Sequence, residues 1–273
     1  MQGLTNTRPH AMSPYGGARS IARTRAAAAL AAVMVWATAF TPPPAQAGPN
    51  FFSPKQDVEL GRAAAQEVER TKPILRGSGR EQRVQRIVSR LARYAPGARY
   101  SYRARVIDER ELNAFALPGG FLYVNRGLID NATEGELAGV IAHEMAHIGL
   151  RHGTQQASRG LLAQAGLQIL GGLAGSRDRD TGRIVQGVGG LGANVLFLKY
   201  SRGAETDADV AGVRMMRRAG YDPMDMARFF EKLRAQAGRD PGKVERFLSS
   251  HPAPAERTAR IRQEARRIQV GSR

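Results

Sequence analysis

The sequence feature that most constrains the fold is the run His143-Glu144-Met145-Ala146-His147. Residues four apart lie on one face of a helix, so the two imidazoles can reach a single ion. Zn²⁺ is the usual ion in such a site, and Glu144 stands where it can act as general base toward a metal-bound water. Because short motifs also arise by chance, this interpretation needs a third ligand and a substrate groove elsewhere in the chain.

Independent signals place this run on a helix. Thr133 and Glu136 have the spacing of a capping box, in which each residue bonds the backbone of the other. The apolar residues Leu137, Val140 and Ile141 follow at the spacing of a helix face. We therefore expect a helix that begins near Thr133 and carries both histidines on one side.

The third ligand is best sought on a later helix, where Glu205 and Asp209 also stand four residues apart. Two histidines and a carboxylate form a common ligand set of catalytic zinc and leave a position for water. Asp209 would then accept a hydrogen bond from a ligand imidazole and fix its tautomer. Without the histidine motif, the pair would be read as a solvated acidic helix start.

Four segments of the chain carry short motifs. They are His143 to His147 with Arg151-His152-Gly153, Tyr200-Ser201-Arg202 with Glu205, Ala208 and Asp209, Asn113 to Gly120, and Ser250-His251-Pro252 with Arg257. They resemble the gluzincin metallopeptidases that include HtpX and the CAAX prenyl protease. The resemblance covers about residues 55 to 268. It implies an α+β fold, a mostly helical zincin-like metallopeptidase domain with a small antiparallel sheet beside the active-site helix.

Carried onto these positions, the resemblance implies one Zn²⁺ per chain, held by His143, His147 and Glu205. Glu144 would be the general base, and Asp209 would support a ligand imidazole. His251 and Arg202 are implied to lie near the site as catalytic residues. His251 would either stabilise the oxyanion or act as a fourth, inhibitory ligand when substrate is absent.

Two apolar runs on either side of Pro118-Gly119-Gly120 predict a hairpin. In the resembling family the first of them is the edge strand beside the cleft. It would pair with an extended substrate backbone by strand addition. The implied substrate-binding residues are Asn113, Ala114, Phe115 and Ala116. His152 lies off the ligand face, and we interpret it as a structural or supporting residue.

Residues 1 to 47 have the pattern of a cleavable secretory signal. A basic start without acidic residues precedes the apolar run Ala26 to Phe40, and Ala45-Gln46-Ala47 is a cleavage signature. We expect export to the periplasm of a bacterium, with residues 48 to 273 as a single metallopeptidase domain. An uncleaved N-terminal anchor is the alternative, and a mitochondrial presequence is a weaker one.

The net charge of +17 comes almost entirely from arginine, and the chain has no cysteine. Disulfides and thiolate metal sites are therefore excluded. The arginines are spread along predicted helices without a nucleic-acid motif, so we expect no nucleic-acid partner and favour a solvated basic surface over an anionic partner.

Residues 161 to 198 depart from the HtpX pattern, in which the corresponding region is membrane-embedded. Here the region is short, glycine-rich and interrupted by charged residues. It predicts two buried or loosely packed helices, with a flap or a peripheral membrane contact as the alternative. The departure favours a soluble, exported, BepA-like branch, without that branch's tetratricopeptide array.

Three functions follow as hypotheses. The first is a zinc endopeptidase of the cell envelope that acts on unfolded or misassembled proteins in quality control. The second is a chaperone or assembly factor with gated or latent protease activity. The third is a basic envelope-binding module that uses its charge on lipid or polyanion. The sequence leaves the oligomeric state undetermined.

Overall fold

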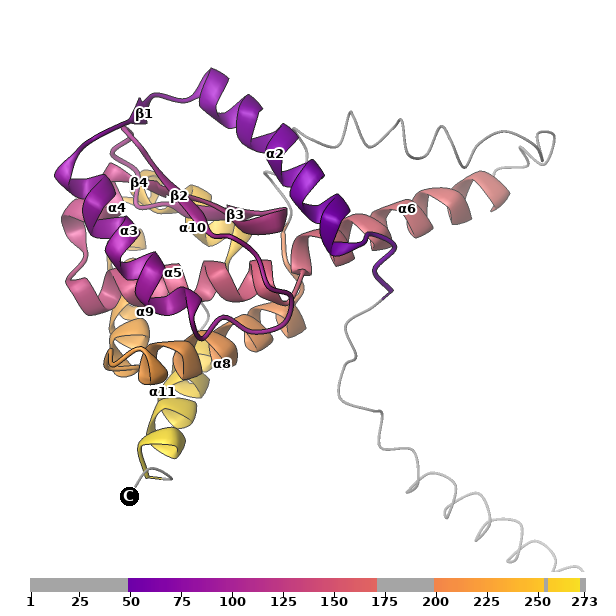
Figure 1. Ribbon diagram of the computed structural model, residues 1–273. Helices are drawn as coiled ribbons and strands as arrows, with labels where there is room; N and C mark the ends of the chain where they lie inside the picture. Colours follow the sequence, from indigo (N-terminus) through magenta and orange to yellow (C-terminus); the bar gives the residue numbers. More distant parts are fainter. Residues whose placement is uncertain (1–48, 171–198, 253–254, 271–273) are drawn as a thin grey trace, which may run out of the picture. The chain divides into compact units, whose positions relative to one another are not determined.

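The structure is a computed structural model that describes residues 49 to 170, 199 to 252 and 255 to 270 (Figure 1). All of these belong to one compact unit, Ala47–Arg273. The expected signal segment and most of the glycine-rich region from residue 161 to 198 lie outside the described residues. The signal and its cleavage point therefore stay predictions.

The sheet has four strands in the order β1-β2-β4-β3: β1 is Ile74–Leu75, β2 is Arg103–Ile107, β3 is Ala114–Leu117 and β4 is Phe121–Asn125. The predicted hairpin is confirmed, since β3 and β4 pair antiparallel. The sheet is mixed rather than purely antiparallel, because β4 lies between β3 and β2 and runs parallel to β2. This order leaves β3 at the edge.

The two faces of the sheet are covered by different helices (Figure 1). Leu122 and Val124 of β4 face the main core, which includes the apolar side of α3 (Gly79–Ala92). Tyr123 points to the opposite face, where α2 (Pro54–Thr71) packs in a smaller core. Because successive side chains of a strand point to opposite faces, β4 contributes side chains to the cores on both sides of the sheet.

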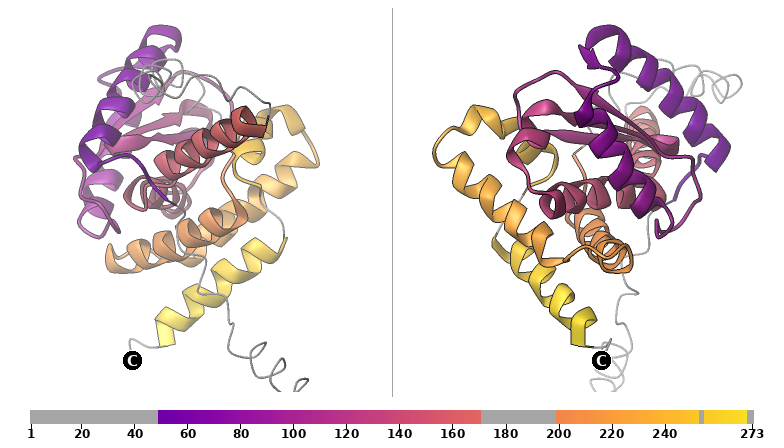
Figure 2. Two further views of the ribbon diagram at one scale, coloured as in Figure 1. Left: turned by 90° about the vertical axis from the view of Figure 1, so that its right-hand side faces the viewer. Right: turned by 60° about the vertical axis from the view of Figure 1, so that its left-hand side comes forward.

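Helix α5 (Glu134–Gly149) lies at the centre of the unit, between the sheet and a layer of three helices (Figure 2). That layer consists of α8 (Arg202–Arg218), α9 (Met224–Ala237) and α11 (Ala255–Val270). The predicted capping box at the start of α5 is present. Because both sides of α5 are covered, every residue from Glu136 to Gly149 is buried.

The remaining described elements are short, apart from α6: η1 Pro118–Gly120, α4 Arg126–Asn131, α6 His152–Leu170, η3 Pro241–Lys243 and α10 Glu245–Ser250. Helix α6 includes the first residues of the region that was predicted to hold two apolar helices. Within the described part of the chain, no helix has the length and apolarity needed to cross a bilayer.

A partly buried ion pair links the start of α2 to the turn that follows α5. The Asp57 carboxylate accepts hydrogen bonds from Arg151 Nε at 2.6 Å and from the Tyr100 hydroxyl at 2.5 Å. Arg151 also donates to the carbonyl of Phe52. Its φ of 63° is one that residues with a side chain seldom adopt, so these contacts hold a costly turn between α5 and α6.

Replacing Asp57 with Asn should lower the free energy of unfolding by about 1.5 to 3 kcal/mol, the usual contribution of a hydrogen bond to a charged group. The reason is that Asp57 is 1% exposed and bonds a charged guanidinium. Chemical denaturation measures the change. Glu59→Gln, at an exposed position of the same helix, is the control and should change stability little. Equal effects of both substitutions would contradict this role of Asp57.

Candidate metal centre

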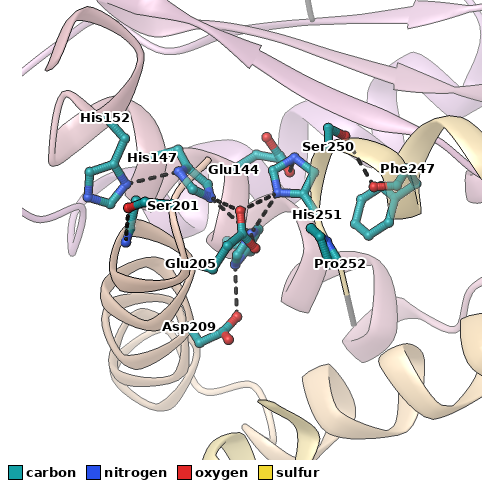
Figure 3. Close-up of polar contacts among 12 residues, drawn as sticks. Glu144, His147, His152, Ser201, Glu205, Asp209, Phe247, Ser250, His251 and Pro252 are labelled. Carbon is teal, nitrogen blue, oxygen red and sulfur yellow. Dashed lines mark hydrogen bonds and ion pairs between the residues drawn. The ribbon is translucent and has the colours of Figure 1, made fainter. Parts of the chain in front are cut away.

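Three elements bring the predicted site residues together (Figure 3). The second half of α5 supplies His143 and His147, and the first turn of α8 supplies Glu205. His251, which directly follows α10, completes a buried group whose possible ligand atoms lie within 4.8 Å of one another. The two helices come close because α8 has Gly212 at the crossing, where a Cβ would lie 3.2 Å from the backbone nitrogen of His143.

The spacing of these atoms fits a metal ion. Nitrogen ligands about 2.0 to 2.1 Å from zinc in a tetrahedron stand about 3.3 Å apart. His143 Nε2 lies 3.0 Å from His147 Nε2 and 3.3 Å from His251 Nδ1. Glu205 Oε1 lies 3.4 Å from His147 Nε2 and 2.9 Å from His251 Nδ1. The donor set is therefore the imidazole and carboxylate set that zinc prefers.

Glu144 lies beside this group with its carboxylate free to act on a water. Both carboxylate oxygens are buried, and neither has a hydrogen-bond partner among the residues that the structure describes. His251 Nε2 lies 3.4 Å from Glu144 Oε1. Burial raises the pKa of Glu144 above its ordinary value. A buried carboxylate with a raised pKa is suited to taking and returning a proton.

The far nitrogens of the two α5 imidazoles have partners that orient the rings. His143 Nδ1 lies 3.0 Å from Asp209 Oδ1, the contact expected from the sequence. His147 Nδ1 lies 2.9 Å from His152 Nδ1. A proton on the far nitrogen of each ring leaves Nε2 as the atom that faces the cluster. His152 is thus a supporting residue, outside the ligand group.

At neutral pH, His147 already has the charge state that a metal needs, whereas His143 must give up a proton to bind one. Burial holds the pKa of His147 well below its usual value, and burial lowers the pKa of His152 to about 4. Burial and Arg257 disfavour a proton on His143, but hydrogen bonds to Asp209 and Glu205 outweigh them and raise its pKa to about 9. His147 is therefore uncharged at neutral pH, the form in which imidazole binds a metal.

Arg257 of α11 is a site residue to which the sequence analysis gave no role. Its side chain is 2% exposed and forms a two-pronged ion pair with Asp209, at 2.6 and 2.8 Å. Nη1 lies 2.5 Å from Glu205 Oε2, and the guanidinium stands over the Phe230 ring. Arg257 therefore places one positive charge between two buried carboxylates. The only sequence signal for Arg257 was its place beside Ser250-His251-Pro252 among the motifs that resemble the family.

Arg202, in contrast, is exposed at the first position of α8, and within the described chain no contact of its side chain with the cluster is found. Its catalytic role stays a prediction. Tyr200 lies closer to the cluster than Arg202 does. Its ring stacks on the His147 ring, with 3.9 Å between the ring centroids. The arginine that contacts the carboxylates of the cluster is Arg257.

The predicted substrate strand lies next to the cluster. Residues Ala116, Leu117 and Pro118 line a small hollow together with His147 and Tyr200. The outer edge of β3 pairs with no strand in the described part of the chain. Asn113 and Ala114 are buried, whereas Phe115 and Ala116 are partly exposed. Their binding of substrate stays a prediction, which this position supports.

A buried histidine pair on one helix, a glutamate from a second helix and a buried glutamate beside them define the site of a zincin-type metallopeptidase. Comparison with known proteins agrees. The model of peptidase family M48 matches residues 78–265. The chain belongs to this family.

Several curated relatives share the family. The chain is 32% identical to the metalloprotease LoiP of Escherichia coli over 161 residues, 58% of this chain and 60% of LoiP. It is 28% identical to the β-barrel assembly-enhancing protease of the same organism over 236 residues, 78% of this chain and 44% of that protein. It is 31% identical to the mitochondrial metalloendopeptidase OMA1 of Schizosaccharomyces pombe over 188 residues, covering 68% and 53%. The chain thus spans about half the length of these relatives.

Asp209→Asn should lower the zinc affinity by about 10- to 100-fold, the usual effect of losing a carboxylate that supports a ligand imidazole. The amide can no longer hold the Nδ1 proton of His143 as a charged acceptor does. Competition with a coloured chelator measures the affinity. Asp207→Asn, at an exposed position two residues away on α8, should leave it unchanged. Unaltered zinc affinity in Asp209→Asn would show that this contact does not tune the metal.

Proposed function

We propose that this protein is a zinc-dependent endopeptidase of the cell envelope that cleaves unfolded or misassembled proteins. The observation that carries the proposal is the buried group of His143, His147 and Glu205 with the buried carboxylate of Glu144 beside it. Membership of a metallopeptidase family supports the same activity.

The residues divide the chemistry between them. His143, His147 and Glu205 would hold Zn²⁺, which when bound acidifies water and polarises the peptide carbonyl. Glu144 accepts a proton from the attacking water and returns it to the leaving amine. Arg257 and Asp209 keep Glu205 and His143 in place.

The edge strand gives a reason for a preference for unfolded substrates. A chain that adds to the outer edge of β3 must present an extended backbone with unpaired N–H and C=O groups. Folded proteins seldom offer such a segment, whereas unfolded or misassembled ones do. Leu117, at the end of β3, lines a hollow together with His147, so this strand end lies next to the cluster.

An envelope location rests on two supports. The leader pattern of residues 1 to 47 is that of an exported protein. A relative that matches 78% of this chain is a protease named for enhancing β-barrel assembly. We therefore propose the bacterial periplasm as the location and protein quality control as the role.

A second candidate function, a chaperone or assembly factor with a gated protease, is favoured by the position of His251. This side chain is buried, and its Nδ1 lies within the ligand group rather than beside it. Four protein ligands would leave zinc without an open position. We propose that His251 closes the site when no substrate is bound.

Glu144→Gln should keep zinc bound and lower the rate of casein cleavage by about 100-fold or more, the usual contribution of a general base. Zinc analysis and a chelator-sensitive casein assay provide the two measurements. Glu134→Gln, at an exposed position of α5, is the control and should keep both zinc and activity. Casein cleavage at the wild-type rate by Glu144→Gln would refute the mechanism.

His251→Ala should raise the rate of cleavage of a short unstructured peptide several-fold while zinc stays bound, because the fourth ligand is removed and three remain. Ser249→Ala, two residues away and exposed, should leave the rate unchanged. A fall in rate with zinc retained would instead assign His251 to stabilisation of the oxyanion, and the gated second function would lose its support.

A further inference from the structure

A second hollow lies on another face of the unit, between α3 and the end of α8. It has a volume of about 480 Å³ and its lining includes Arg86, Ser89, Arg90, Arg93, Tyr94 and Ala219. The arginines are spaced by four and three residues, so they share the exposed side of α3. The opposite side of α3, which carries Val84, Ile87, Val88 and Leu91, is buried in the core.

The arginines of this hollow differ from others on the same helix. Arg80 pairs with Asp130 and Arg83 with Glu134. For Arg86 and Arg93, no ion pair with a carboxylate is found among the described residues, and no carboxylate lines the hollow. Among the described residues, the wall of the hollow therefore has several arginines and no acidic side chain.

Two guanidinium groups around the hollow are held in place by aromatic rings. Arg90 stands over the Tyr221 ring, 4.5 Å from its centroid, and Arg218 stands over the Tyr94 ring at 4.9 Å. Gly220 leaves room for Arg90, since a Cβ there would lie 2.7 Å from Arg90 Nη2. Groups fixed in this way lose less freedom when they bind a ligand.

We propose that this hollow is a binding site for phosphate groups, either on a lipid headgroup or on a free phosphoanion. Planar guanidinium groups match the oxygens of phosphate and can bond two of them at once. A serine hydroxyl and a tyrosine on the same wall add neutral hydrogen-bonding groups. The volume lies in the range of ordinary ligand pockets.

The site is separate from the metal cluster and does not depend on the proposed peptidase function. Helix α8 links them, with Glu205 in its first turn and Arg218 at its last residue. That separation along the helix is about 20 Å at 1.5 Å per residue. Phosphate binding and zinc binding can therefore be measured independently on the same protein.

The test compares two triple variants of the full chain. Arg86→Gln, Arg90→Gln and Arg93→Gln together remove the charge of the hollow. Arg234→Gln, Arg239→Gln and Arg260→Gln together remove the same charge from exposed positions elsewhere on the unit. Since the net charge of the two variants is equal, general attraction to anions is equal too. Circular dichroism and zinc content confirm that both stay folded.

Two probes distinguish the sources of phosphate. Calorimetry measures binding of inorganic pyrophosphate, and sedimentation measures binding to phosphatidylcholine vesicles with and without phosphatidylglycerol. We expect the hollow variant to lose at least about tenfold in affinity for one or both probes, and the control variant to lose little.

The possible results distinguish a phosphate site from attraction by net charge. A selective loss with pyrophosphate assigns a site for free phosphoanions, and a selective loss with vesicles alone assigns a site for lipid headgroups; both support the proposal. Equal losses in the two variants would show attraction by net charge only and would overturn it. Binding of neither probe by the unaltered chain would overturn it as well.

Discussion

The metal centre depends on one buried arrangement of charge, in which Arg257 stands between the carboxylates of Asp209 and Glu205. Removing two carboxylates from water costs several kcal/mol each unless they are paired and hydrogen-bonded. Arg257 supplies the pairing, and the imidazole of His143 supplies a further contact. The C-terminal helix α11 is thereby part of the site, because it carries the cation that allows α8 to place two acids in the core.

The same arrangement explains why α5 can be buried along most of its length. A helix with two histidines and a glutamate on it would ordinarily keep that side in water. Here the sheet covers one side and α8 covers the other, with Gly212 allowing the close approach. The polar side chains of α5 then meet each other and α8 rather than solvent. The edge position of β3 follows from the sheet order and leaves a strand edge beside the cluster.

The arginine-rich composition has more than one structural use. Arg151 and Arg257 are at least partly buried and pair with carboxylates. These ion pairs link α2 to the turn after α5, and α11 to α8. Others, such as Arg80 and Arg83, form ion pairs near the surface that contribute little each. Arg86, Arg90 and Arg93 belong to neither group, since they line one hollow. The net charge of the sequence could not distinguish these uses.

The sequence by itself determined the local features. The capping box at Thr133, the spacing of His143 and His147, and the spacing of Glu205 and Asp209 follow from helix geometry, which needs no tertiary information. The turn at Pro118-Gly119-Gly120 likewise gave the hairpin of β3 and β4.

Only the tertiary structure decided which distant parts meet. The family resemblance implied a small antiparallel sheet, but β4 lies between β3 and β2 and is parallel to β2. The ion pairs of Arg257 with Asp209 and Glu205 had no assigned role in the sequence, because an arginine reaches a carboxylate from any helix that packs beside it. Likewise His251 joins the ligand group through the packing of α10, more than a hundred residues from His143. Spacing along one helix is fixed by its backbone, whereas contacts between helices depend on packing of the whole core.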